Sequence, residues 1–313
     1  MNTLFYHYGA LGDFITVLPT LALWKKLHSG TVTLLGKTEH GMLARASGLT
    51  DSVLDADSGR YRFIFRSGSS PQLLTSFLNR FDAAFLFAHD NSEISLNFRD
   101  HFSGRLFSQP PFPSEKKHVI DYHLSLITET TPGPEDRIPR LSTISADIRP
   151  SESAFPHDGK PVILLHPGSG SFMKNWPFEH FLTLAATLRG HDYTIIWITG
   201  PAEDLPAIPE EDFHLRNRPY SEYLAVFRHC HRFIGNDSGM THLAAAAGCD
   251  VISLFGPSDP VQWAPRGTGR ITVIHHPPEE CSPCHRQSRR ASRCNGTCMS
   301  GISPGEVLSA LHY

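Results

Sequence analysis

Two apolar strands joined through one short helix occupy residues 232–254, and this pattern restricts the chain to a small group of folds. Strands are expected at 232–234 and 250–254, and the alanine-rich stretch between them predicts a helix at 239–247. Strands that alternate with helices form parallel sheets with helices on both faces. The segment therefore predicts an α/β protein.

The same alternation extends along the whole chain, with one interruption at residues 131–160, where Pro, Ser and Asp give the composition of a linker. We therefore expect two doubly wound, Rossmann-like parallel-sheet domains, residues 1–150 and 151–313, facing a central cleft, with ligands beyond the carboxyl ends of the strands. The other expected strands are 3–8, 31–35, 52–55, 83–87, 162–165, 194–198 and 271–274. The other expected helices are 14–27, 41–48, 71–80, 119–128, 178–189, 221–229 and 304–311. We expect residues 90–115 to be abbreviated and irregular.

Bulk properties narrow the class of protein. The formal net charge of the 313 residues is -3, which argues against nucleic acid as the main partner. No apolar run is long enough to span a bilayer, and the N-terminus lacks the basic and apolar pattern of a signal peptide. The expected location is the cytoplasm.

The turn before the helix at 239–247 gathers Asp237, Ser238, Gly239 and His242. Ser and Asp cap helix starts, where the first amides lack partners inside the helix and the helix dipole is positive. Such a turn is a ready phosphate site. An ordinary capped helix without a ligand explains the same residues.

A second loop of this kind follows the strand at 162–165. Here Gly168, Ser169, Gly170 and Ser171 precede Lys174 and a helix, which is the geometry that cradles phosphates through backbone amides. The loop lacks the ending of a Walker A motif and the third glycine of the dinucleotide fingerprint. Two such loops in one half of the chain strengthen the prediction of a phosphate site.

Asp13 lies in the first turn between strand and helix, after Gly9 and Gly12. Glycines in such a turn allow the backbone to approach a ligand closely. The carboxylate could act as a general base toward a hydroxyl nucleophile, or it could cap the helix. The position alone does not separate these roles.

Three segments together resemble one family, the heptosyltransferases of glycosyltransferase family 9. They are residues 8–19 (YGALGDFITVLP), residues 166–177 (HPGSGSFMKNWP) and residues 233–245 with 254–257 (FIGNDSGMTHLAA and LFGP). The resemblance implies the GT-B architecture and an inverting, metal-independent transfer of heptose from ADP-heptose to the lipopolysaccharide core, with no cofactor required.

On this resemblance the N-terminal domain binds a lipid-linked saccharide acceptor and the C-terminal domain binds the nucleotide sugar. Asp13 would deprotonate the acceptor hydroxyl, and the enzyme would be a monomer that contacts the inner face of the inner membrane. The residues implied in donor and phosphate binding are Ser169, Gly170, Ser171, Lys174, Asp237, Ser238, Gly239, Met240, Thr241 and His242.

The sequence gives fewer signals for the acceptor-binding residues than for the donor site. Arg60, Arg62 and Arg66 would share one face of an extended segment, where they could bind phosphates or sugar-acid carboxylates. A solvated edge is the alternative. Asp55 and Asp57 form the only Asp-x-Asp pair, and we expect no metal there.

Four cysteines near the C-terminus, Cys281, Cys284, Cys294 and Cys298, have the spacing C-x2-C…C-x3-C. This spacing is compatible with a structural zinc site, with disulfides or with free thiols. For the whole chain, two alternatives to heptose transfer stay open. One is a GT-B enzyme that uses another nucleotide sugar, and the other is an inactive nucleotide-sugar-binding protein.

Overall fold

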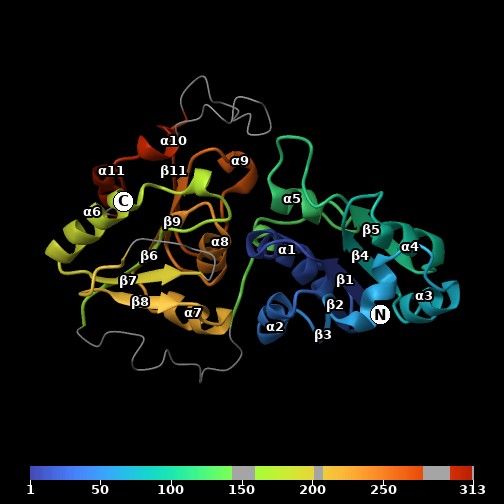
Figure 1. Cartoon of the computed structure of the whole chain (residues 1–313). Coiled ribbons are helices and arrows are strands. Elements are labelled where there is room, and N and C mark those ends of the chain that lie inside the picture. The colour runs from blue at the N-terminus through green and yellow to red at the C-terminus, as the bar shows by residue number, and fades with distance from the viewer. Residues whose placement is uncertain (143–158, 201–206, 278–296, 312–313) are drawn as a thin grey trace. The chain divides into compact units, whose positions relative to one another are not determined.

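The computed structural model describes residues 1–142, 159–200, 207–277 and 297–311 (Figure 1). The chain divides into two compact units, Met1–Ile144 and Ser145–Tyr313. Each unit contains one parallel sheet with helices around it, as the alternation in the sequence predicts. No described helix has the length and apolarity needed to cross a bilayer.

The N-terminal sheet has the strand order β3-β2-β1-β4-β5, and all neighbouring strands are parallel. Its central strands are apolar runs that are buried on both faces, which is the pattern of a sheet covered on two sides. The strands are β1 Thr3–His7, β2 Val32–Gly36, β3 Ser52–Asp55, β4 Ala83–Phe87 and β5 Arg105–Gln109. The helices are α1 Leu11–Leu27, α2 Thr38–Ala46, α3 Pro71–Leu78, α4 Glu93–His101 and α5 Val119–Leu124, with 3-10 helices η1 Gly59–Phe65 and η2 Glu135–Arg137.

The C-terminal sheet has the order β11-β10-β9-β6-β7-β8, again parallel throughout. The chain builds outward from β6 to one edge and from β9 to the other, so the strand order reverses between β6 and β9. The strands are β6 Val162–His166, β7 Thr194–Thr199, β8 Phe213–Arg216, β9 Arg232–Asn236, β10 Val251–Phe255 and β11 Ile271–His275. The helices are α6 Phe178–Gly190, α7 Tyr220–Phe227, α8 Gly239–Ala246, α9 Pro260–Trp263, α10 Thr297–Ser300 and α11 Pro304–Ser309, with η3 Phe172–Lys174.

All strands and helices expected from the sequence are present, with ends that differ by a few residues. Two expectations are wrong. Residues 90–115 are not irregular, because they form α4 and the edge strand β5. Residues 131–142 are not a free linker, because η2 packs against α1 and α5, and Lys26 pairs with Asp136 at 3.0 Å.

Candidate functional site

The C-terminal site lies where β6 and β9 run side by side. His166 at the end of β6 is in register with Gly235 of β9, so the loops that follow these strands leave the same edge of the sheet. The strand order reverses between them, and such switch points are where doubly wound sheets bind ligands. The two loops singled out from the sequence therefore meet at one place.

The turn from β9 into α8 offers the free backbone donors of a helix N-terminus. Ser238 caps α8, and its Oγ accepts from Thr241 N at 3.3 Å. Thr241 Oγ1 donates to the carbonyl of Asn236 at 2.5 Å, so both polar groups of Thr241 are used inside the protein. In the described part of the chain, the amides of Ser238, Gly239 and Met240 have no acceptor. These three amides are the donors left for an anion.

Lys174 and Asp237 bring the two loops together electrostatically. Lys174 Nζ lies 2.5 Å from Asp237 Oδ2, with the Lys side chain 24% exposed and the Asp side chain 7% exposed. The partial exposure of the Lys174 side chain leaves room for a second anionic partner. An ammonium group beside three unpaired amides is suited to the negative charge of a diphosphate.

His242 lies one turn into α8 and is buried. Burial lowers the pKa of its imidazole, Asp237 acts in the opposite direction, and Lys174 lowers it further. The ring is therefore neutral at pH 7, and it adds no positive charge to the site.

The loop after β6 is held in shape by Ser169. Its hydroxyl lies 2.7 Å from Ser171 O and 2.7 Å from Asn175 Oδ1, and it accepts from Ser171 N at 3.2 Å. The Ser169 hydroxyl thus shapes the loop. Beside Gly170 the space is open, since no heavy atom of the described residues lies within 4 Å of the place where a Cβ would stand. A ligand can approach the backbone closely there.

Asn236 is a residue that the sequence analysis did not select. It is fully buried at the end of β9. Its Nδ2 donates to Pro167 O at 2.7 Å, and its Oδ1 accepts from Trp176 N at 3.0 Å. Trp176 in turn donates from Nε1 to Ile302 O at 2.9 Å. Asn236 therefore ties the β6 loop to β9, and a polar residue at the end of an apolar strand was the signal that could have found it.

In the N-terminal unit, Asp13 lies in the first turn of α1, directly beyond the carboxyl end of β1. Its Oδ2 accepts from Ala10 N at 3.1 Å, so the carboxylate caps the helix. A Cβ on Gly9 would stand 2.8 Å from the His7 ring and 3.0 Å from Asp13 Cβ, so these three residues pack closely. The strand order of this sheet reverses between β1 and β4, which places Asp13 at the N-terminal switch point.

His7 is buried next to this turn, and no hydrogen-bond partner for its Nδ1 is found among the described residues. Burial lowers the pKa of His7 to about 3, with His123, His40 and Lys37 adding to the shift. The imidazole is therefore neutral.

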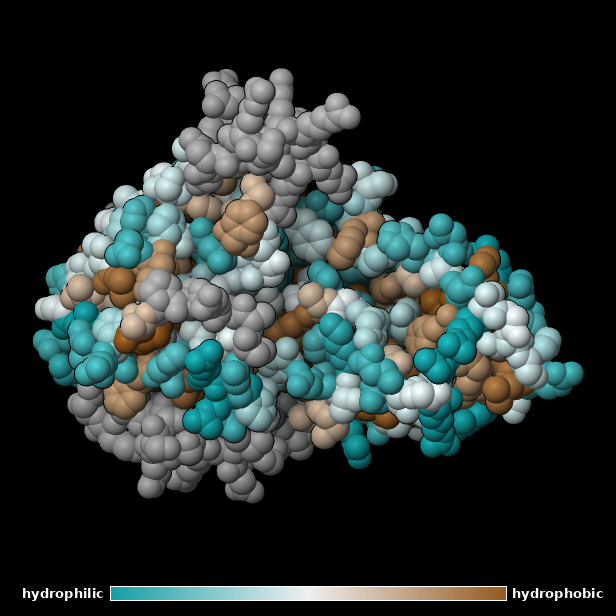
Figure 2. Space-filling view, viewed as in Figure 1, coloured by the Kyte–Doolittle hydropathy of each residue, from teal (hydrophilic) through white to brown (hydrophobic). Residues whose placement is uncertain are grey.

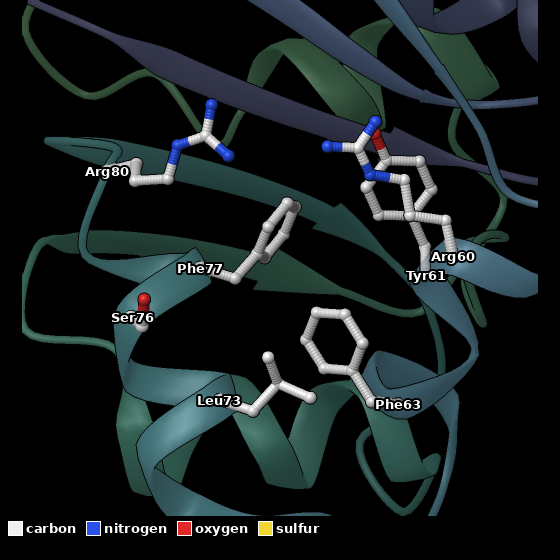
Figure 3. A pocket seen from close by; sticks show the side chains of 7 residues that line it. All are labelled: Arg60, Tyr61, Phe63, Leu73, Ser76, Phe77 and Arg80. Atoms are coloured by element: carbon white, nitrogen blue, oxygen red, sulfur yellow. The ribbon is translucent and has the colours of Figure 1, made fainter.

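The three arginines expected on the acceptor side are not on one face of an extended segment. That expectation is wrong, because Gly59–Phe65 is a 3-10 helix, in which residues two apart point in different directions. All three side chains are exposed. Arg60 lines a pocket that Arg62 and Arg66 do not line (Figure 3).

The described residues contain no group of His, Cys, Asp and Glu that could hold a metal ion. Asp55 and Asp57 form a local turn, since Asp55 Oδ1 accepts from Asp57 N at 3.0 Å, and Tyr8 donates to Asp57. Cys298 is buried in α10 beside Gly256. Cys281, Cys284 and Cys294 lie outside the described residues.

Comparison with protein families gives a match to a model described as glycosyltransferase family 9 (heptosyltransferase), over residues 74–294. The match includes both loops of the C-terminal site and begins after Asp13. Lipopolysaccharide heptosyltransferase 3 of Escherichia coli is 24% identical over 218 residues, which is 64% of this chain and 63% of the relative. The aligned region thus spans less than two thirds of that relative's length.

Solved structures are similar over nearly the whole chain. A glycosyltransferase of family 9 from Veillonella parvula has a TM-score of 0.73 and 18% identity, covering 99% of this chain and 96% of its own. An E. coli heptosyltransferase solved with ADP has a TM-score of 0.67 and 14% identity, covering 100% and 99%. At these identities the likeness shows the fold, and it confirms the expected GT-B fold class.

Proposed function

Because the chain belongs to glycosyltransferase family 9, the heptosyltransferases, we propose that it transfers a heptose from ADP-heptose to a saccharide of the lipopolysaccharide core. The observation that supports this proposal most is the junction of β6 and β9, where Lys174 pairs with Asp237 in the turn that carries the three amides. The similar E. coli enzyme solved with ADP supports the choice of nucleotide.

In the proposed reaction the acceptor hydroxyl oxygen attacks the anomeric carbon of the heptose, and the bond from that carbon to the diphosphate breaks. Asp13 takes the hydroxyl proton as general base. The diphosphate leaves with its negative charge, which Lys174 and the amides of Ser238, Gly239 and Met240 stabilise. A single displacement of this kind inverts the anomeric configuration, and these donors make a metal ion unnecessary.

Asp237 holds the ammonium of Lys174 in place, and we propose that its other oxygen accepts hydrogen bonds from the donor sugar. The backbone of Asp237 is fixed because its N–H donates to Leu254 O at 3.0 Å. The loop Ser169–Ser171 would cover the phosphates through its backbone at the open space beside Gly170. A lipid-linked acceptor would place the reaction at the inner face of the inner membrane.

Calorimetric titration of the full chain with ADP, UDP and GDP tests the donor site. We expect ADP to bind most tightly, with and without a metal chelator. Tighter binding of UDP or GDP would favour a different nucleotide sugar, and no binding of any of them would contradict a donor site between β6 and β9. Transfer from ADP-heptose to a deacylated core acceptor then separates an enzyme from an inactive binding protein.

Variants of the Lys174–Asp237 pair test the assignment at residue level. Lys174→Ala should weaken ADP binding by about 10- to 100-fold, because a charge-assisted contact is lost and the Asp237 carboxylate is left unpaired beside the phosphates. The double variant Lys174→Ala with Asp237→Asn should bind ADP better than the single variant. Equal affinity of the two would show that Asp237 does not act through this pair.

Asp13→Asn tests the general base. The amide oxygen of Asn can still accept from Ala10 N, so the helix cap is kept while the basic group is lost. We expect transfer to fall at least about 100-fold, with ADP affinity unchanged. The exposed Asp90→Asn is the control. Undiminished turnover in Asp13→Asn would exclude Asp13 as the base.

A further inference from the structure

A pocket of about 260 Å³ lies between η1 and α3 of the N-terminal unit (Figure 3). Phe77 forms its middle, with the Tyr61 ring centroid at 5.7 Å and the Phe63 ring centroid at 5.6 Å. Ser70 caps α3 and Pro71 occupies its first turn, so the start of this wall is fixed by the sequence. The pocket is thus built on a cluster of aromatic rings.

Two guanidinium groups lie at one end of this pocket. Arg60 stands 5.8 Å from the centroid of Tyr61, and Arg80 stands 5.8 Å from the centroid of Phe77. In the part of the chain that the structure describes, neither arginine has a carboxylate partner. Figure 3 shows both groups on the same side of the pocket, with the Tyr61 hydroxyl beside Arg60. This end is therefore suited to one anionic group.

The opposite end is apolar. Figure 3 shows Phe63 and Leu73 on the side away from the guanidinium groups. Leu73 is 48% exposed, and Leu96 of the neighbouring helix α4 is 37% exposed. Hydrophobic residues reach the surface in the region of these helices (Figure 2). Cationic and apolar groups are thus separated along one pocket.

We propose that this pocket binds an anionic membrane phospholipid, with the phosphate between Arg60 and Arg80 and the start of an acyl chain along Phe63 and Leu73. A free sugar fits less well, because Tyr61 and Ser76 supply the only uncharged hydroxyl groups among the lining residues. A bare phosphate would leave the exposed apolar end uncovered. The site would anchor the N-terminal unit to an acidic bilayer surface, whatever reaction the chain catalyses.

Vesicle co-sedimentation of the full chain tests the site. We expect binding to vesicles of equal parts phosphatidylglycerol and phosphatidylcholine, and none to phosphatidylcholine alone. Arg60→Gln with Arg80→Gln should weaken binding about thirtyfold, because each arginine near an anionic surface contributes about 1 kcal/mol. Leu73→Ser should weaken it about fivefold through lost apolar burial.

Arg62→Gln with Arg66→Gln is the matched control, because it removes the same amount of charge from exposed positions that do not line the pocket. All five positions are exposed, so folding should be unchanged, as thermal melting would verify. An equal loss of vesicle binding in the two double variants would show that only the general surface charge matters, and this would overturn the proposal. Displacement of the vesicles by millimolar glycerol 3-phosphate would also overturn it, since a soluble phosphate would then suffice.

Discussion

Asn236→Ala is the substitution that tests most directly how the C-terminal site is assembled. The side chain is fully buried. Its Nδ2 donates to Pro167 O at 2.7 Å and, over a longer 3.4 Å, to Gly168 O, and its Oδ1 accepts from Trp176 N at 3.0 Å. The partners fix which end of the amide is which, because a backbone N–H must meet Oδ1 and a carbonyl must meet Nδ2. Alanine removes these bonds, and the buried Pro167 carbonyl and Trp176 amide lose this partner.

Each net hydrogen bond contributes about 1 kcal/mol, and each orphaned buried group costs about 1 kcal/mol or more. We therefore expect Asn236→Ala to lower the free energy of unfolding by about 2 to 4 kcal/mol. For a domain of this size that corresponds to a fall in Tm of about 5 to 15 °C. ADP affinity should fall as well, because the β6 loop is no longer tied to β9.

Denaturant unfolding of the full chain, followed by tryptophan fluorescence and circular dichroism, measures the loss. Asn91→Ala, at an exposed position, is the control. Asn236→Asp sharpens the test, because a carboxyl group can donate to Pro167 O only when protonated. Its folded-state pKa should be raised, so the variant should be closer to wild type at pH 5 than at pH 7. A loss below about 1 kcal/mol for Asn236→Ala would refute the bridging role.

Three further predictions concern glycines and buried histidines. Gly170→Ala should leave stability unchanged and weaken ADP binding in calorimetry, since the added methyl group enters open space beside the loop. Gly235→Ala should destabilise by about 1 to 3 kcal/mol in denaturant unfolding, because its Cβ would stand 2.8 Å from the Phe233 ring. Burial lowers the pKa of His7 and His123 to about 3 and of His40 to about 4, from 6.5. The folded state favours the neutral rings. Their contribution to the free energy of unfolding is therefore complete above pH 6.5, and it is lost as the pH falls from 6.5 toward the lowered pKa values. Unfolding at pH 7, 6 and 5 should show a loss approaching about 1.4 kcal/mol per pH unit per histidine, and a flat profile would contradict the burial argument.

The central strands and the phosphate loops could be predicted from the sequence because both leave local signals. The strand β6 is a continuous apolar run, and α8 starts with a capping serine directly after an apolar strand. The register of β6 with β9 then follows from the topology of a doubly wound sheet. The sequence therefore predicts that the residues of the two loops lie together.

The edge strands β5 and β8, and the arrangement of the arginines, could not be predicted in the same way. The strands β5 and β8 mix polar and apolar residues because only part of each is covered. Arg60 lies in η1 and Arg80 follows α3, and the two line one pocket only in the folded unit. A 3-10 helix at Gly59–Phe65 has no simple periodic signal, so the sequence does not show how its arginines are arranged.

The packing of residues 131–142 bears on where the N-terminal unit can be cut. Leu141 is buried, Arg137 pairs with Asp121 at 2.9 Å, and Ser142 N donates to Ser47 Oγ at 3.1 Å. A fragment truncated near residue 130 would remove these contacts with α5 and the end of α2, and it would also remove η2 from its place against the apolar helix α1. A fragment made to express this unit alone should therefore extend through at least Ser142, although the composition of residues 131–142 resembles that of a flexible linker.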